Sequence, residues 1–329
     1  MAATTISVQT VVLLLASLVT VFAASPTTKA PTPSVLDVAR SHGAAKFASL
    51  ASKSAYVDKL LTQSVSDPLA YTVFAFTDRA YQRAPAAVAK FINDSQALDW
   101  LLEYHISPGP TFSGDLKNNL LITSLYPSPT TGASLPPQYI RANIYRTFAE
   151  KGNRTSGPRT VVTASGSPII QADLPASNGL VHIIDKVIFP LPTGADMAEY
   201  LHLDGRFSSL YMSLKSVNLT SALKTDPSRP LTIFAPSNAV FANLPPDVKN
   251  KLKDKAFLTQ VLEYHVVQGA LYAAGLYDNL WLRTLSGQDL LVEIGPGGVY
   301  VGDGKVVQTD NTVINGVVHE ISAVLLPPK

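Results

Sequence analysis

The sequence predicts two tandem domains of one fold, each combining helical segments with β-strands. Three short motifs occur twice, in the same order, along the 329 residues. They are Thr72–Tyr81 (TVFAFTDRAY) and Thr232–Phe241 (TIFAPSNAVF), Leu102–His105 and Leu262–His265 (both LEYH), and Asn178–Ile183 (NGLVHI) and Asn315–Glu320 (NGVVHE). Repetition of this kind indicates a duplicated unit rather than one large domain with a single cleft.

The composition fits two domains of ordinary size and argues against several classes of function. Hydrophobic residues make up 46% of the chain, enough for two cores, whereas charged residues make up 15% and the net charge is +2. A nucleic-acid-binding protein would need a basic stripe, so we predict no nucleic-acid partner. The absence of cysteine excludes thiolate metal sites, iron–sulfur clusters and cysteine nucleophiles.

The N-terminus is typical of a secretory signal peptide. Val11–Ala23 is an apolar run of 13 residues followed by small residues, too short to cross a bilayer comfortably. We predict a signal peptide at 1–23, with a retained anchor as the alternative, and an extended Ser/Thr/Pro-rich tether at 24–33. No second apolar run of membrane length follows, so we predict a secreted, extracellular protein without a membrane span. Three sequons then become expected N-glycosylation sites at the surface: Asn93, Asn153 and Asn218.

Each domain is expected to open with helices and continue into a strand and a further helix. Apolar residues recur at helical spacing in both copies: Phe47, Leu50, Val57 and Leu61, then Phe207, Leu210, Leu214 and Val217. Short β-type runs follow at Thr72–Phe76 and Leu231–Ala235, and amphipathic helical segments at Ser95–His105 and Lys255–His265.

The second half of each domain is expected to be β-structure. Asp303-Gly304 predicts a two-residue hairpin turn, because this pair tolerates positive φ. The closing segments, Leu180–Phe189 and Val317–Leu326, are almost continuously apolar. We therefore expect each to be the central strand of its domain, buried on both faces.

The first copy carries 23 extra residues between its second and third motifs. We place this insertion at about 126–159, a stretch rich in Pro, Gly and Ser that also contains Tyr126, Tyr139 and Tyr145. One interpretation is a tolerated surface insertion. The other is a contact loop, in which exposed tyrosines among flexible residues form a binding surface. These three tyrosines are our candidate binding residues there.

Together the three motifs resemble those of the fasciclin-domain family. The resemblance covers about residues 34 to 329, nearly all of the predicted mature chain. It implies an α+β fold of two tandem fasciclin-like domains, at 34–192 and 193–329, each an antiparallel β-wedge flanked by helices. The chain departs from the family pattern at Phe76, where the family prefers Pro, at Asp78, where it prefers Asn, and at Ser322, where it has Asp.

The repeated histidines are the other candidate binding residues: His105, His182, His265 and His319. A zinc site would need three or four closely spaced ligands, and no carboxylate accompanies these histidines in both copies. We therefore expect buried imidazoles bonded to the backbone, and we predict no metal, no cofactor and no catalytic residue.

Three functional hypotheses follow. In the first, prompted by the family resemblance, the protein is a non-catalytic accessory that holds aromatic small molecules for a secreted laccase-like oxidase, which couples aromatic polyketides in fungal pigment or toxin biosynthesis. In the second, it is an adhesion protein that binds wall or matrix glycans and proteins, with avidity from two domains. In the third, it is a hydrolase that uses its motif histidines.

Overall fold

The computed structural model describes residues 32–62, 70–85, 88, 92–126, 138–147, 158–190 and 195–328. Residues Pro33–Lys329 form one compact unit. The predicted signal peptide, most of the tether and the sequon at Asn153 lie outside the described residues. Within the described residues, no helix has the length and apolar character needed to cross a membrane.

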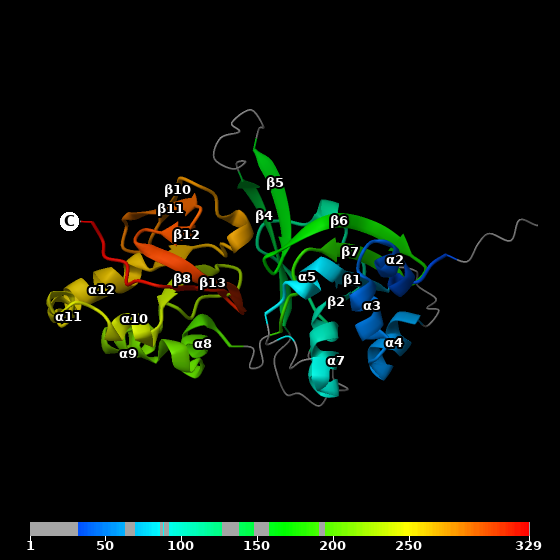
Figure 1. Ribbon diagram of the computed structural model, residues 1–329, viewed down its shortest axis with the longest axis horizontal. Coiled ribbons are helices and arrows are strands. Elements are labelled where there is room, and N and C mark those ends of the chain that lie inside the picture. Colours follow the sequence, from blue (N-terminus) through cyan, green and yellow to red (C-terminus); the bar gives the residue numbers. More distant parts are fainter. Residues whose placement is uncertain are drawn as a thin grey trace, which may run out of the picture. The chain divides into compact units, whose positions relative to one another are not determined.

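The first domain is a seven-stranded sheet flanked by short helices (Figure 1). Its helices are α2 (Val35–Ser41), α3 (Ala45–Ala51), α4 (Ala55–Thr62), α5 (Asp78–Gln82), α7 (Ser95–Tyr104) and the 3-10 turn η1 (Ser113–Asp115). Its strands are β1 (Tyr71–Phe76), β2 (Ile106–Pro108), β3 (Leu120–Thr123), β4 (Tyr139–Thr147), β5 (Arg159–Ala164), β6 (Ser167–Ala176) and β7 (Gly179–Ile184). The strand order is β2-β1-β7-β6-β5-β4-β3.

The second domain repeats this arrangement, which confirms the predicted α+β fold of two tandem domains. Its helices are α8 (Met197–Leu203), η3 (Gly205–Phe207), α9 (Ser208–Ser216), α10 (Asn238–Ala242), α11 (Pro246–Lys251), α12 (Lys255–Tyr264) and η4 (Ala273–Gly275). Its strands are β8 (Leu231–Pro236), β9 (Val266–Gln268), β10 (Leu280–Arg283), β11 (Asp289–Gly295), β12 (Gly298–Val301), β13 (Gly304–Val313) and β14 (Gly316–Ile321). The strand order, β9-β8-β14-β13-β12-β11-β10, matches that of the first domain strand for strand.

The first and last strands of each domain pair in parallel. Strand β7 runs parallel to β1, and β14 runs parallel to β8, whereas the other strand pairs among the described residues are antiparallel. Every residue of β7 is buried, as expected for a strand covered on both faces. The expected closing strands are therefore central and buried, although they end at Ile184 and Ile321 rather than continuing to Phe189 and Leu326. The sheets are mixed rather than wholly antiparallel.

Two details differ from the sequence-based expectation. The hairpin between β12 and β13 turns at Gly302-Asp303, one residue earlier than predicted, because Val301 pairs with Gly304 and Gly302 takes the positive φ of 53°. The insertion is also not one loop. Strand β4, the counterpart of β11, lies in the middle of it, so the extra residues fall mainly before Tyr139 and after Thr147.

The Asn-Gly pair of the third motif fixes the start of each closing strand. The Asn178 amide accepts from the Val35 N–H, and the Asn315 amide accepts from the Met197 N–H. The following glycine lies against the neighbouring parallel strand. A Cβ at Gly316, whose φ is 155°, would stand 1.8 Å from the Leu231 carbonyl oxygen.

We therefore expect Gly316→Ala to lower the free energy of unfolding by about 3 kcal/mol or more, since the backbone of β8 must move to admit a methyl group. Urea unfolding measures this change. The control is Gly205→Ala, because a Cβ at Gly205 meets no atom within 4 Å. Equal stability of the two variants would contradict this account of the motif glycine.

Candidate functional site

His105 and His265 follow the last residue of a helix and are fully buried. Helices α7 and α12 are capped at their N-termini by Asp94 and Asp254, whose carboxylates accept N–H bonds from Ala97 and Phe257 at 2.9 Å. At the other end, Nδ1 of each histidine donates to a carbonyl one helical turn back, at Leu101 or Val261, at 2.7 Å. Nε2 accepts the Ile188 N–H at 3.3 Å in the first domain and the Leu325 N–H at 2.9 Å in the second.

His182 and His319 lie on the closing strands and are also buried. Their Nδ1 atoms accept the N–H groups of Asp173 and Asp310, both at 3.2 Å. Their Nε2 atoms donate to the carbonyls of Thr111 and Leu271, both at 2.7 Å. Each domain thus holds two neutral imidazoles in opposite tautomers.

Both ring nitrogens of every motif histidine are therefore bonded to the backbone. Burial lowers the pKa of His105 and His265 to about 4, and it also lowers the pKa of His182 and His319. This confirms the expectation of buried, backbone-bonded imidazoles and leaves no ring nitrogen for a substrate. Within the described residues, no group of three or more His, Asp or Glu side chains is placed to hold a metal ion.

The three tyrosines of the insertion are not the exposed contact surface that the sequence suggested. Tyr126 is 1% exposed and packs edge-on against Trp100. Tyr139 is half-buried at the start of β4 and lines a cavity of only about 20 Å³, enough for a single water molecule. Tyr145 is also half-buried and contacts the second domain. Exposure was predicted from loop composition, but two of the three belong to a strand.

Strand β4 joins the two domains through Tyr145 and Arg141. The Tyr145 hydroxyl donates to the Ala270 carbonyl at 2.7 Å and accepts the Tyr272 N–H at 3.1 Å. The guanidinium of Arg141, a residue only 2% exposed, donates to the carbonyls of Pro227 at 3.0 Å and Ile314 at 2.8 Å. Sequence reasoning missed Arg141, although the alternation of apolar and polar residues from Ile140 to Ile144 was a signal of the strand that carries it.

An ion pair adds to this domain contact. Lys186 in the first domain lies 2.7 Å from Asp310 in the second. The counterpart of Asp310 is Asp173, whose carboxylate accepts hydrogen bonds from the N–H and the hydroxyl of Ser113. In the second domain Ala273 replaces that serine and supplies only its N–H. The loss of one hydroxyl therefore leaves one oxygen of Asp310 for Lys186.

A groove of about 550 Å³ lies in the second domain. It runs between helices α10 and α11 on one side and the segment around β14 on the other. Its lining is mainly aliphatic, with a few polar groups: Ser237, Ala239, Val240, Asn243, Leu244, Pro245, Val248, Val307, Glu320, Ile321, Ser322, Ala323, Val324 and Leu326. The volume lies within the usual range of small-molecule sites.

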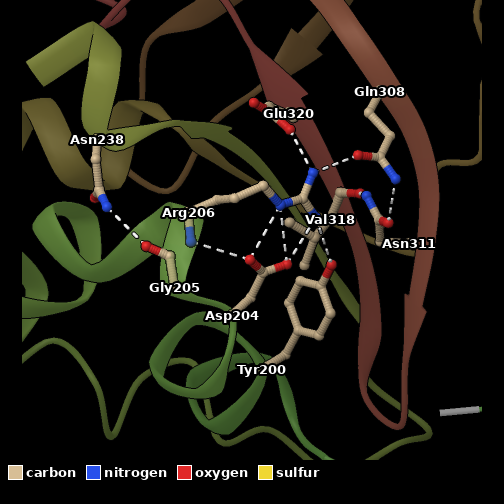
Figure 2. A network of polar contacts seen from close by, with 9 residues as sticks. All are labelled: Tyr200, Asp204, Gly205, Arg206, Asn238, Gln308, Asn311, Val318 and Glu320. Carbon is tan, nitrogen blue, oxygen red and sulfur yellow. Dashed lines mark hydrogen bonds and ion pairs between the residues drawn. The ribbon is translucent and has the colours of Figure 1, made fainter. Parts of the chain in front are cut away.

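The one charged lining residue, Glu320, belongs to a polar network (Figure 2). Its carboxylate lies 2.7 Å from the guanidinium of Arg206, which also contacts Asp204 at 2.6 Å and Gln308. Gln308 in turn donates to Asn311 at 3.1 Å, and Asn311 donates to the Val318 carbonyl at 3.0 Å. The network ties η3 to β13 and β14, and Arg206 divides its positive charge between the two carboxylates of Asp204 and Glu320.

Two of the predicted glycosylation sites can be placed. Asn93 and Asn218 are exposed, as a glycan would require. Their glycosylation stays a prediction.

Comparisons with known proteins agree with the fold. The family model described as Fasciclin domain matches residues 42–190 and again residues 205–327. Transforming growth factor-beta-induced protein ig-h3 of Sus scrofa is 27% identical over 280 residues, which cover 83% of this chain and 37% of that protein. Fasciclin-like arabinogalactan protein CTB11 of Cercospora beticola is 30% identical over 196 residues, covering 57% of this chain and 50% of that protein.

A solved structure gives a looser match. A FAS1 domain pair from the insect cell adhesion molecule Fasciclin I is 20% identical, with a TM-score of 0.39, over 87% of this chain and 98% of that one. The chain spans about a third of the length of the ig-h3 relative and half of the Cercospora relative.

The buried histidines predict a defined pH dependence of stability. Folding lowers the pKa of His105 and His265 from 6.5 to about 4, so the unfolded chain binds more protons between these values. Their contribution is fully present above pH 6.5 and is lost as the pH falls toward 4, by up to about 1.4 kcal/mol per pH unit for each histidine.

Urea unfolding between pH 7 and 4 tests this. We expect His105→Gln and His265→Gln each to reduce the slope of stability against pH, because glutamine does not titrate. Met212→Gln, at an exposed position, is the control and should leave the slope unchanged. A slope unaffected by the buried substitutions would exclude this role.

The domain contact predicts coupled unfolding. Arg141→Met removes the donors to two partly buried carbonyls and should cost about 2 kcal/mol or more. We expect calorimetry to show one transition for the wild type and two for this variant. Lys186→Met is the milder comparison and should cost about 1 kcal/mol, because the lysine side chain is 43% exposed, although Asp310 is only 12% exposed. A single transition at the wild-type midpoint in Arg141→Met would refute the coupling.

Proposed function

Because the chain belongs to the fasciclin domain family, we propose that it is an extracellular binding protein that assists a secreted laccase-type oxidase in coupling aromatic polyketides. The groove of the second domain carries this proposal. It has the size of a small-molecule site, its walls are aliphatic, and its one carboxylate is paired with an arginine.

The chemistry divides between the two proteins. The oxidase removes one electron and one proton from each of two phenols and passes them to dioxygen. The two phenoxyl radicals then join through a new carbon–carbon bond. This protein contributes by holding one ring so that a particular carbon and a particular face meet the partner radical. Histidines already committed to backbone groups suit a positioning role rather than redox chemistry.

Coupling of 2-naphthol tests the proposal, because its carbon–carbon dimer is axially chiral. We expect a laccase alone to give equal amounts of the two enantiomers. Addition of the folded chain should give an excess of one enantiomer, measured by chiral chromatography. The chain alone should consume no oxygen. A heat-unfolded sample of the same chain is the control. Equal amounts of the two enantiomers at every protein concentration would reject the accessory role.

A second candidate is binding to wall or matrix glycans. Two exposed sequons and a pair of domains joined by buried hydrogen bonds favour it, as do relatives that carry the name fasciclin-like arabinogalactan protein. Fractionation of cells that express the tagged chain discriminates the two candidates. Retention in the wall fraction supports glycan binding, whereas complete release into the medium supports the accessory role.

A further inference from the structure

The two domains differ at the rim of the groove, which in the second domain includes Asn243 and Ser322. In the first domain, Arg83 is the residue that caps the end of α5, and Asp185 follows the last residue of β7. Their side chains form an ion pair at 3.0 Å, in which one guanidinium nitrogen contacts both carboxylate oxygens. This pair bridges the helix end to the segment that leaves the closing strand.

The counterparts of this pair are Asn243 and Ser322. Asn243 caps the end of α10, as Arg83 caps α5. Ser322 donates its N–H to the Lys305 carbonyl, as Asp185 does to the equivalent carbonyl of Pro168. The equivalence therefore follows from the backbone as well as from the repeated motifs. Neither replacement carries a charge, no bond joins them, and both line the groove.

Two polar groups in the groove have hydrogen-bonding capacity to spare. Ser237 is the N-cap residue of α10, but its side chain makes no capping hydrogen bond. Its counterpart Thr77 accepts the Ala80 N–H at 2.9 Å. The side-chain amide of Asn243 likewise bonds to no part of the chain that the structure describes, although its backbone N–H is bonded within the helix end. These groups can donate to, or accept from, a hydroxyl or carbonyl oxygen.

The remaining lining disfavours anionic ligands. No lysine or arginine is among the lining residues, and Glu320 is already bound to Arg206. The apolar side chains come from both walls, and two of them are well exposed, Val307 at 55% and Leu326 at 41%. Covering these surfaces with an apolar ligand removes them from water at both walls.

We propose that the groove of the second domain, opened by the replacement of the Arg83–Asp185 pair with Asn243 and Ser322, binds one uncharged hydroxylated aromatic molecule. This site deepens the proposed function, on which its aromatic ligand class rests. The ring system lies between α10 and the segment after β14, and its oxygen atoms meet Ser237 and Asn243. In the part of the first domain that the structure describes, the ion pair bridges the equivalent rim.

The test restores the bridge of the first domain in the second. The double variant Asn243→Arg/Ser322→Asp is compared with the wild type by titration calorimetry using 1,8-dihydroxyanthraquinone, an uncharged probe. We expect one binding site per chain and at least a tenfold loss of affinity in the variant. Anthraquinone-2-sulfonate, which has the same ring system and a negative charge, should bind at least tenfold more weakly than the uncharged probe.

A matched control adds the same residue types elsewhere. Met212→Arg/Ser216→Asp places a pair on the exposed face of α9, away from the groove, and should leave affinity unchanged. The thermal midpoint of each variant shows whether it is folded. Should the bridging variant prove unfolded, Val240→Glu replaces it, because a carboxylate in the apolar wall would lose its water when the probe binds, and only one residue is changed.

Each result bears on the proposal. Equal affinity of the bridging variant and the wild type overturns the groove as the site, while the accessory function stands if coupling remains selective. Absence of probe binding, together with equal amounts of the two enantiomers of the coupled product, overturns both the groove site and the accessory function. A dimer in light scattering that the bridging substitutions dissociate assigns the groove to a second copy of the chain. A pull-down of a laccase by the wild-type chain that these substitutions abolish, without loss of probe binding, assigns the groove to a protein partner. Either result overturns the small-molecule site.

Discussion

The parallel pairing of the first strand of each domain with its last is the constraint on which the rest of the structure depends. It brings the two ends of a domain together in the middle of the sheet, where every backbone group must be bonded and every side chain packed. The three repeated motifs supply the parts that meet there. The first motif is the opening strand, the third is the closing strand, and the histidine of the second reaches from a helix end to the segment just after the closing strand. Buried imidazoles suit this task because one ring satisfies both a donor and an acceptor.

A frame held in this way leaves other positions free to diverge between the two copies. Strand β4 in the first domain carries Arg141, whereas the equivalent position of β11 carries Leu291. The first copy thereby has the donors that join it to its neighbour. The second copy has Ala273 where the first has Ser113, which leaves one Asp310 oxygen for Lys186 of the first domain. Neither change touches the parallel strands, so each alters what a domain binds without altering its fold.

The sequence predicted the parts of the molecule that repeat. Motif order, helical spacing and the apolar closing segments correctly indicated two copies of one fold, and the lack of accompanying carboxylates correctly indicated backbone-bonded histidines. The sequence-based prediction failed for features that had to be inferred within one copy from its local composition. Loop-like residues around Tyr145 concealed a strand, because proline, glycine and serine on both sides of β4 obscured its short alternating pattern. The hairpin was displaced by one residue because two glycines, Gly302 and Gly304, flank Asp303 and either can hold the turn. Ser322 was noted as a departure from the family pattern, but its meaning depends on Asn243, far away in sequence, and on their shared place at the rim.

The rim shows why a duplicated fold acquires a site at little cost. The Arg83–Asp185 pair is about half exposed at the arginine and a third exposed at the aspartate. A pair this accessible to water contributes at most about 1 kcal/mol, so its replacement in the other copy leaves stability nearly unchanged. The same replacement removes a bridge between a helix end and the segment beyond the closing strand. Both of these elements are positioned by the parallel strands and by the buried histidines rather than by the pair itself. The groove therefore keeps its shape when the bridge is absent, and a stable frame and an open binding surface are compatible in one domain.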